Sequence, residues 1–121
     1  MGAVANAGIT TFGGFLDYPL SDFQRLVSVN LQGSFFLAQA AAQQMIKQQS
    51  SGRIIFMSSV TGHQAHPNLS AYGMAKAALE MLAKSLGVEL AAHRITVNTI
   101  APGTTMTERT RQLDPNYQKV W

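Results

Sequence analysis

Ile54-Ile55-Phe56-Met57-Ser58-Ser59 is a run of four apolar residues that ends in two serines. A short, continuously apolar run is typical of a strand that is buried on both faces of a parallel sheet. Two more strands are predicted at residues 2–6 and 95–100, and helices are predicted between the strands at about residues 21–47 and 70–91. The alternation of strands and helices indicates an α/β fold with a parallel sheet.

Apolar spacing and end signals define the two helices. Ser21-Asp22-Phe23-Gln24 has the form of a capping box, which predicts that Ser21 is the N-cap. The first helix has a face with three-four spacing, made of Phe23, Leu26, Val27, Asn30, Leu31, Ser34, Phe35, Ala38 and Ala42. The second helix has one stripe of Leu79, Leu82, Leu86 and Leu90, and another of Met74, Met81, Ser85 and Val88. The two stripes predict that one face of this helix packs on the sheet and that the other packs on a further partner. Residues 104–121 read as a polar, irregular tail, with a helical turn near 107–113.

Polar or glycine residues follow each predicted strand. Asn6-Ala7-Gly8 follows the first, Ser59 follows the second, and Pro102-Gly103 follows the third. In parallel α/β sheets, ligands bind at or beyond the carboxyl ends of the strands. The sequence therefore predicts a ligand site at this edge of the sheet.

Tyr72 and Lys76 indicate what that site does. Residues four apart on a helix lie on one face, so the lysine ammonium would lie beside the tyrosine phenol. A neighbouring cation favours the phenolate form, which makes the tyrosine a usable proton donor and acceptor near neutral pH. Ser59, thirteen residues before Tyr72, could hydrogen-bond the same substrate oxygen. Together they form a site for moving a proton on and off an alcohol or carbonyl oxygen.

Composition excludes several other functions. The chain has 121 residues, a net charge of +3 and no cysteine, and its nine basic residues are scattered. A nucleic-acid surface would need clustered basic residues, and no apolar run approaches the roughly 20 residues of a membrane span. Without cysteine, a cytoplasmic location is the default expectation. His63-x-x-His66 has no third ligand nearby, so no metal site is predicted.

Five segments, in order, resemble the short-chain dehydrogenase/reductase family: Asn6-Ala7-Gly8, Val29-Asn30-Leu31, Met57-Ser58-Ser59, Tyr72-x-x-x-Lys76 and Val97–Gly103. Among its subgroups, the chain looks most similar to bacterial sugar or polyol dehydrogenases and 3-oxoacyl reductase-like members. The resemblance implies a partial Rossmann-like, doubly wound parallel sheet. This chain would hold the β-α-β-α-β portion of a three-layer αβα sandwich.

The resemblance also implies roles. Tyr72 would be the general acid in carbonyl reduction and the general base in alcohol oxidation, assisted by Lys76. Ser59 would stabilise the substrate oxygen, and Asn30 would hold a water that connects Lys76 to solvent. The cofactor would be NAD or NADP, the substrate a small alcohol or carbonyl compound, and the full-length form a homo-oligomer through the two long helices. The implied cofactor-binding residues are Asn6, Ala7, Gly8, Tyr72, Lys76, Pro102, Gly103, Thr105 and Thr107.

Four residues of these segments could have purely structural roles instead of functional ones. Asn30 could simply satisfy a neighbouring backbone group, and Asn6 could be a hydrogen-bonding residue at the sheet end. Gly8 could be present because its turn needs a positive φ. Ser58 should point the opposite way from Ser59 if the strand continues, so it is excluded from catalysis.

The chain departs from the family pattern at both ends. No glycine-rich strand-turn-helix precedes Asn6, and family members usually continue beyond Trp121, so residues 1–121 resemble a single partial domain. Right-handed crossovers would put both helices on one face and leave the other bare. We therefore expect the isolated polypeptide to be poorly stable or held by a partner. A non-catalytic fragment, or a module that associates through its helices, is the alternative function.

Overall fold

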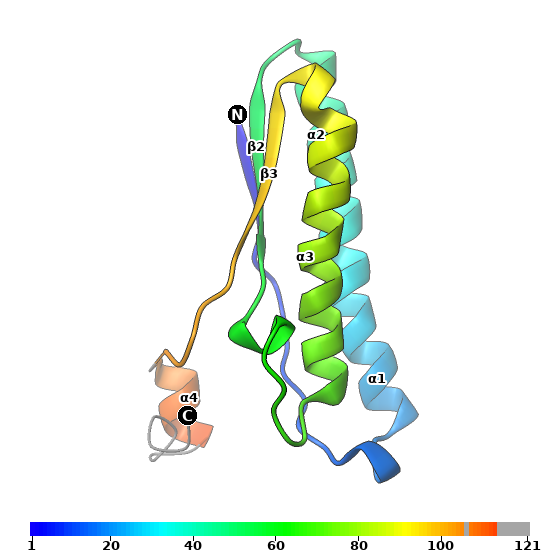
Figure 1. Ribbon diagram of the computed structural model, residues 1–121, viewed down its shortest axis with the longest axis vertical. Coiled ribbons are helices and arrows are strands. Elements are labelled where there is room, and N and C mark those ends of the chain that lie inside the picture. Colours follow the sequence, from blue (N-terminus) through cyan, green and yellow to red (C-terminus); the bar gives the residue numbers. More distant parts are fainter. Residues whose placement is uncertain (106, 114–121) are drawn as a thin grey trace.

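The computed structural model describes residues 1–105 and 107–113, and the end of the predicted tail lies outside that range (Figure 1). Three strands, β1 (Gly2–Ala5), β2 (Gly52–Met57) and β3 (Ile95–Ile100), form a parallel sheet in the order β1-β2-β3. The helices are α1 (Leu20–Val27), α2 (Gly33–Lys47), α3 (Ser70–Leu90) and the short α4 (Glu108–Leu113). The predicted α/β fold with a parallel sheet is confirmed. Its strand limits and α3 agree with the expected ranges within two residues.

The first long helix begins earlier than its capping signal predicts. Pro19 is the N-cap, and its carbonyl accepts a 3.1 Å hydrogen bond from the Phe23 N–H. The Ser21 N-cap prediction is wrong, because Ser21 already lies inside the first turn of α1. The extended backbone of Pro19 (φ −69°, ψ 140°) positions its carbonyl to start the helix.

A π-helical segment, η2 (Ser28–Gln32), joins α1 to α2 without a break. Its hydrogen bond runs from the Gly33 N–H to the Ser28 carbonyl. The buried stripe recurs at four-residue spacing, which drifts by about 40° per step around an ordinary α-helix. A π turn contains more residues than an α turn, so it offsets part of this drift where it occurs. The residues buried along it are Leu26, Asn30, Ser34, Ala38, Ala42 and Met45, whereas the predicted members Phe23 and Phe35 are exposed.

Helix α3 packs one face on the sheet and exposes another. Leu79 and Ala83 belong to the core with Ile54, Phe56 and Ile95, and Leu82, Leu86 and Leu90 pack against its border. The second predicted stripe points away, so Met74, Met81 and Val88 are exposed.

Both long helices cover the same face of the sheet (Figure 1). Ile54 and Phe56 point toward them and are buried, whereas Ile55 and Met57 point the other way and are only half-buried. In the described part of the chain, neither α2 nor α3 covers that second face. The expectation that residues 54–57 are buried on both faces is therefore wrong here, because both crossovers return on one side, as the crossover rule predicts.

The three strands end level with one another. Ala5 pairs with Phe56, and Phe56 pairs with Thr99. The pairing extends beyond the strands, since the Ser58 N–H donates to the Ile100 carbonyl at 2.7 Å and the Val60 N–H donates to the Pro102 carbonyl at 3.1 Å. The segments that follow the strands therefore leave the sheet at one common edge.

Two glycines of α3 provide a matched test of how closely this helix approaches the segment after β2. A Cβ added at Gly73 would lie 2.8 Å from the Thr61 carbonyl oxygen, whereas one added at Gly87 would meet nothing within 4 Å. Alanine is worth up to about 1 kcal/mol over glycine inside a helix. We expect Gly87→Ala to raise Tm and Gly73→Ala to lower it, because overpacking costs about 1–3 kcal/mol. Thermal unfolding of both variants measures this, and equal gains in Tm would contradict the close approach.

Candidate active site

A cleft of about 600 Å³ opens at the carboxyl edge of the sheet. All of the predicted site residues except Asn30 line it: Asn6, Ala7, Gly8, Ser59, Tyr72, Lys76, Pro102, Gly103, Thr105 and Thr107. The prediction missed other lining residues, namely Ile9, Thr10, Met57, Ser58, Arg109 and Thr110. Thr10 carried a usable signal, because it lies four residues beyond the first predicted strand. The strand ends and α3 thus bring together residues that are far apart in the sequence.

Lys76 is the buried cation of this cleft. It is only 5% exposed, and its Nζ donates a 2.8 Å hydrogen bond to the Met57 carbonyl at the end of β2. The same Nζ lies 5.5 Å from the centroid of the Tyr72 ring, within range of a cation–π attraction. Burial lowers the pKa of Lys76 below its ordinary value of 10.5. The predicted neighbourhood of amine and phenol is therefore present, on one face of α3.

Asn30 lies behind the cleft rather than in it. It is fully buried in η2, where its Oδ1 accepts a 2.8 Å hydrogen bond from the Ile9 N–H and its Nδ2 donates a 2.9 Å bond to the Ile9 carbonyl. This is the alternative in which the side chain satisfies a backbone group. The amide holds the segment after β1 against the long helix, and a role for Asn30 in a proton relay stays a prediction.

Gly8 does not have a positive φ, so the turn does not require glycine for that reason. None of the described glycines has a positive φ; the residues that do are Gln49, Asn68 and Arg94. A Cβ at Gly8 would lie 3.4 Å from Asn30 Oδ1 and 3.6 Å from Lys76 Nζ. The missing side chain keeps space open beside the lysine amine.

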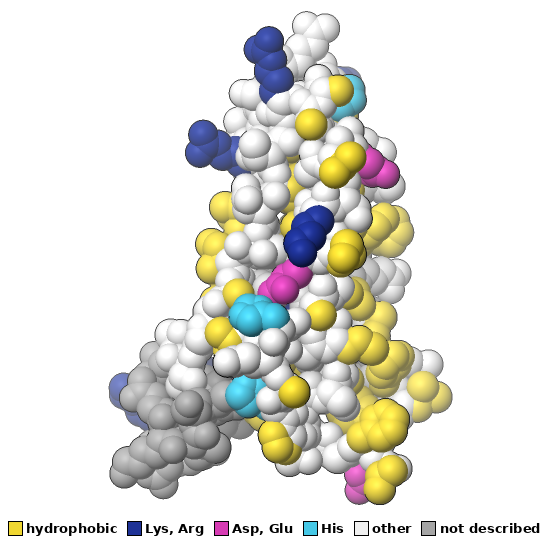
Figure 2. Space-filling model, in the orientation of Figure 1, with side chains coloured by type: hydrophobic (Ala, Val, Ile, Leu, Met, Phe, Trp, Pro, Cys, Tyr) yellow, Lys and Arg dark blue, Asp and Glu magenta, His cyan; other side chains and the backbone are white. Residues whose placement is uncertain are grey.

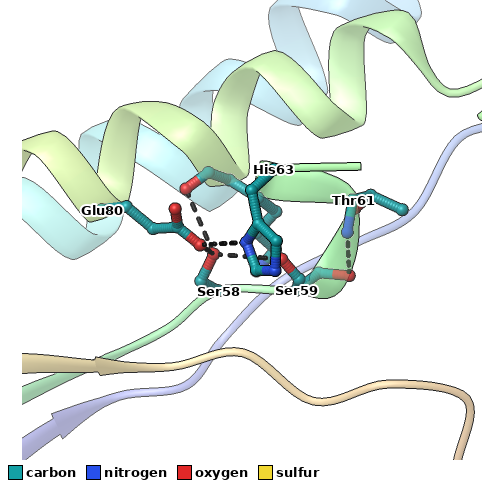
Figure 3. Close-up of polar contacts among 6 residues, drawn as sticks. Ser58, Ser59, Thr61, His63 and Glu80 are labelled. Carbon is teal, nitrogen blue, oxygen red and sulfur yellow. Dashed lines mark hydrogen bonds and ion pairs between the residues drawn. The ribbon is translucent and has the colours of Figure 1, made fainter. Parts of the chain in front are cut away.

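The Ser58 side chain points toward Glu80 on α3, whereas the Ser59 side chain points along the loop toward Thr61 (Figure 3). The Ser58 hydroxyl donates to Oε1 of Glu80 on α3 at 2.8 Å. Ser59 lines the cleft, and its Oγ accepts a 3.3 Å hydrogen bond from the Thr61 N–H, which caps the short 3-10 helix η3 (Val60–Gly62). Ser59 therefore presents its hydroxyl from a capped and hydrogen-bonded turn.

The segment after β3 closes the far side of the cleft. Thr105 Oγ1 donates to the Gly103 carbonyl at 3.3 Å, and Arg109 Nη2 reaches Thr10 Oγ1 at 3.4 Å. The last contact links α4 to the segment after β1. Among the described residues that line the cleft, Lys76 and Arg109 are the cations and none is acidic. The cleft is therefore suited to an anionic or electron-rich ligand.

Two further checks concern other kinds of site. In residues 1–105 and 107–113, no three His, Asp or Glu side chains come together as metal ligands would. No described helix is both long enough and apolar enough to cross a membrane.

The lowered pKa of Lys76 predicts a pH dependence of stability. The folded protein releases this proton at a lower pH than the unfolded chain, so between the two pKa values the unfolded chain binds more protons. The free energy of unfolding must then rise with pH in the interval below 10.5. Urea unfolding between about pH 7 and 10 measures this effect. The free energy of unfolding of the wild type should rise with pH relative to that of Lys76→Met, because the variant has no amine at this position to titrate. A difference that stays flat or falls would show that burial does not disfavour the charged amine.

Comparisons with known proteins agree with this geometry. The sequence profile described as short chain dehydrogenase matches residues 2–118. "Uncharacterized oxidoreductase YohF" of Escherichia coli (strain K12) is 44% identical over 100 residues, which cover 83% of this chain and 40% of that protein. A gluconate 5-dehydrogenase from Burkholderia cenocepacia J2315 in complex with NADP and tartrate superposes with a TM-score of 0.87, at 37% identity over 93% of this chain and 44% of that one. An NAD⁺-bound xylitol dehydrogenase superposes with a TM-score of 0.87, at 34% identity over 97% of this chain and 45% of that one. The chain spans less than half the length of each of these proteins.

It belongs to the short-chain dehydrogenase family, and its sheet is part of a Rossmann-like fold.

Proposed function

We propose that this chain carries the catalytic half of an oxidoreductase that transfers a hydride between NAD or NADP and a secondary alcohol or ketone. The observation that carries the proposal is the shared cleft of Ser59, Tyr72 and Lys76, in which the buried lysine amine lies against the tyrosine ring. Family membership supports the same reaction class.

The proton chemistry follows from the side chains. In carbonyl reduction, the Tyr72 hydroxyl donates its proton to the substrate oxygen, and in alcohol oxidation the Tyr72 oxygen accepts that proton. Lys76 places its amine beside the Tyr72 ring, with Nζ 5.5 Å from the ring centroid, and so holds a donor next to the reacting hydroxyl. The Ser59 hydroxyl donates a hydrogen bond to the oxygen on which negative charge develops, which is where preorganised donors contribute most.

The residues of the cleft also fit a nicotinamide cofactor. Ala7 and Gly8 present little side chain at the end of β1, Thr105 and Thr107 supply hydroxyls, and Arg109 adds a positive charge. A bound nicotinamide supplies or accepts the hydride. Asn6, Ala7 and Gly8 would hold its adenosine side, and Pro102, Gly103, Thr105 and Thr107 would hold its nicotinamide side.

The similarity to a gluconate and a xylitol dehydrogenase supports a sugar or polyol as the substrate of this protein, and a 3-oxoacyl compound is the other candidate. A cytoplasmic location stays part of this prediction.

A homo-oligomer through α2 and α3 belongs to the same proposal. The outward faces of these helices expose Phe35, Phe36, Leu37, Met81 and Val88. Hydrophobic side chains gather along the helical side of the molecule (Figure 2). A contiguous apolar patch of this kind is typical of a protein–protein contact.

The same apolar faces support a second candidate function, a module that only associates with other chains. Binding of the cofactor distinguishes the two candidates. In the protein encoded by the complete open reading frame that contains residues 1–121, a fluorescence titration with NADH and NADPH should show saturable binding if the protein is an oxidoreductase, whereas the isolated 121-residue chain should bind weakly or not at all. An association module would bind neither.

Replacement of Tyr72 tests the reaction directly. In the protein encoded by the complete open reading frame that contains residues 1–121, Tyr72→Phe should lower turnover by roughly 10²–10⁴-fold, because the acid–base hydroxyl is lost. The affinity for NADH or NADPH should change little. Tyr18→Phe is the matched control, because Tyr18 lies outside the cleft and bonds Thr11. Steady-state absorbance of the reduced nicotinamide gives the rates, and wild-type turnover by Tyr72→Phe would end the proposal.

Introducing a charged residue on the apolar face of α3 tests whether the proposed homo-oligomer forms through this face. Met81 and Val88 are 60% and 82% exposed on α3. Met81→Glu should shift the protein toward the monomer in sedimentation velocity, because a buried unpaired carboxylate is costly in an interface. Gln112→Glu adds the same charge on α4 and should leave the association unchanged. An oligomer that persists in Met81→Glu would show that this helix face is not the contact.

A further inference from the structure

Glu80 continues the row of side chains that carries the acid–base pair. Tyr72, Lys76 and Glu80 follow one another at four-residue spacing along α3, so they lie on adjacent turns of one side of the helix. The carboxylate is 23% exposed and does not line the cleft. The chemistry proposed above leaves it without a role.

The Glu80 carboxylate binds the residue next to Ser59. The Ser58 hydroxyl lies 2.8 Å from Glu80 Oε1, 3.3 Å from the Lys76 carbonyl and 3.5 Å from the Ser59 carbonyl. A hydroxyl has one proton, and an ionised carboxylate only accepts, so the proton of Ser58 belongs on the shortest of these bonds. This bond fastens the end of β2 to α3.

The same carboxylate oxygen also contacts His63, the residue that follows η3. His63 Nδ1 lies 3.3 Å from Glu80 Oε1 (Figure 3). Between the two contacts, a Cβ at Gly62 would lie 2.9 Å from Oε1 and 3.0 Å from Ser58 Oγ. A side chain there would have to displace the Glu80 carboxylate or the Ser58 hydroxyl, so the loop closes tightly around the carboxylate.

We propose that Glu80 is a positioning residue that sets where Ser59 presents its hydroxyl relative to Tyr72. Segment 58–63 carries Ser59, and one oxygen of Glu80 contacts both of its ends. Because Tyr72 and Glu80 share one rigid helix, the carboxylate transfers the helix position to the serine loop. The inference rests on the proposed function, since it assigns Glu80 to the same reaction.

The decisive experiment combines Glu80→Ala with Ser59→Ala in the protein from the complete open reading frame. Glu80→Ala should lower kcat by about tenfold, because a displacement of the order of 1 Å at a reacting group costs up to 10²-fold. The affinity for NADH should not change. Glu80→Gln should retain most of kcat, since its amide oxygen still accepts from Ser58. In the Ser59→Ala background, Glu80→Ala should cause no further loss, because it acts through Ser59.

Amide hydrogen exchange gives a readout that does not need activity. The Thr61 N–H donates to Ser59 Oγ, so its exchange should quicken in Glu80→Ala and stay near the wild-type rate in Glu80→Gln. Glu89→Ala, which removes an exposed carboxylate from the same helix, is the control and should change neither exchange nor kcat.

The outcomes separate this inference from the proposed function. An unchanged kcat in Glu80→Ala, or the same fold loss with and without Ser59, overturns the positioning role even if Tyr72→Phe is inactive. An active Tyr72→Phe overturns the proposed function, while the exchange rate of Thr61 still reports whether Glu80 holds the loop. Wild-type exchange at Thr61 in Glu80→Ala would also overturn the inference.

Discussion

The hydrogen bond from the Lys76 amine to the Met57 carbonyl is the contact on which the site depends. An amine buried in protein is costly unless it is hydrogen-bonded. Here the end of β2 supplies the acceptor, and the face of the Tyr72 ring supplies a further attraction. The lysine can stay in place only while α3 and β2 hold their relative positions. Its burial therefore links the proposed acid–base chemistry to the packing of the sheet.

That packing relies on small residues where α3 meets its neighbours. Ala71 and Ala75 are buried in a cluster with Leu26 of α1, and Gly73 approaches the backbone of Thr61. Larger side chains would hold the helix away from η3 and from the strand end. Further along α3, Leu79 and Ala83 bind the helix to the core. The reactive first turns are thus anchored by apolar contacts of later turns, which do not touch the cleft.

Local patterns in the sequence predict much of this arrangement. The apolar run at 54–57, the helical spacing of α3 and the polar residues after each strand place Ser59, Tyr72 and Lys76 at one edge. Contacts between distant segments have no local pattern. The bonds from Asn30 to Ile9 and from Glu80 to Ser58 join residues 21 and 22 positions apart, and each depends on how a loop turns. The Ser21 capping motif is a local signal that loses to Pro19, whose fixed geometry starts the helix first.

The outer faces of α2 and α3 and the open face of the sheet are both uncovered in the described part of the chain, and they relate differently to the site. The outer faces of α2 and α3 expose large apolar side chains, and the open face of the sheet also carries apolar residues, namely Val4, Ile55, Met57 and Ile100, beside polar ones such as Thr96 and Asn98. Covering either face removes apolar area from water and so contributes to stability. Tyr72 and Lys76, to which the proposed function assigns the acid–base chemistry, lie on α3, one of the helices with an exposed apolar face. Association through these helices would therefore hold rigid the same element that positions Tyr72 and Lys76, while the open sheet face affects the site only through the strand ends.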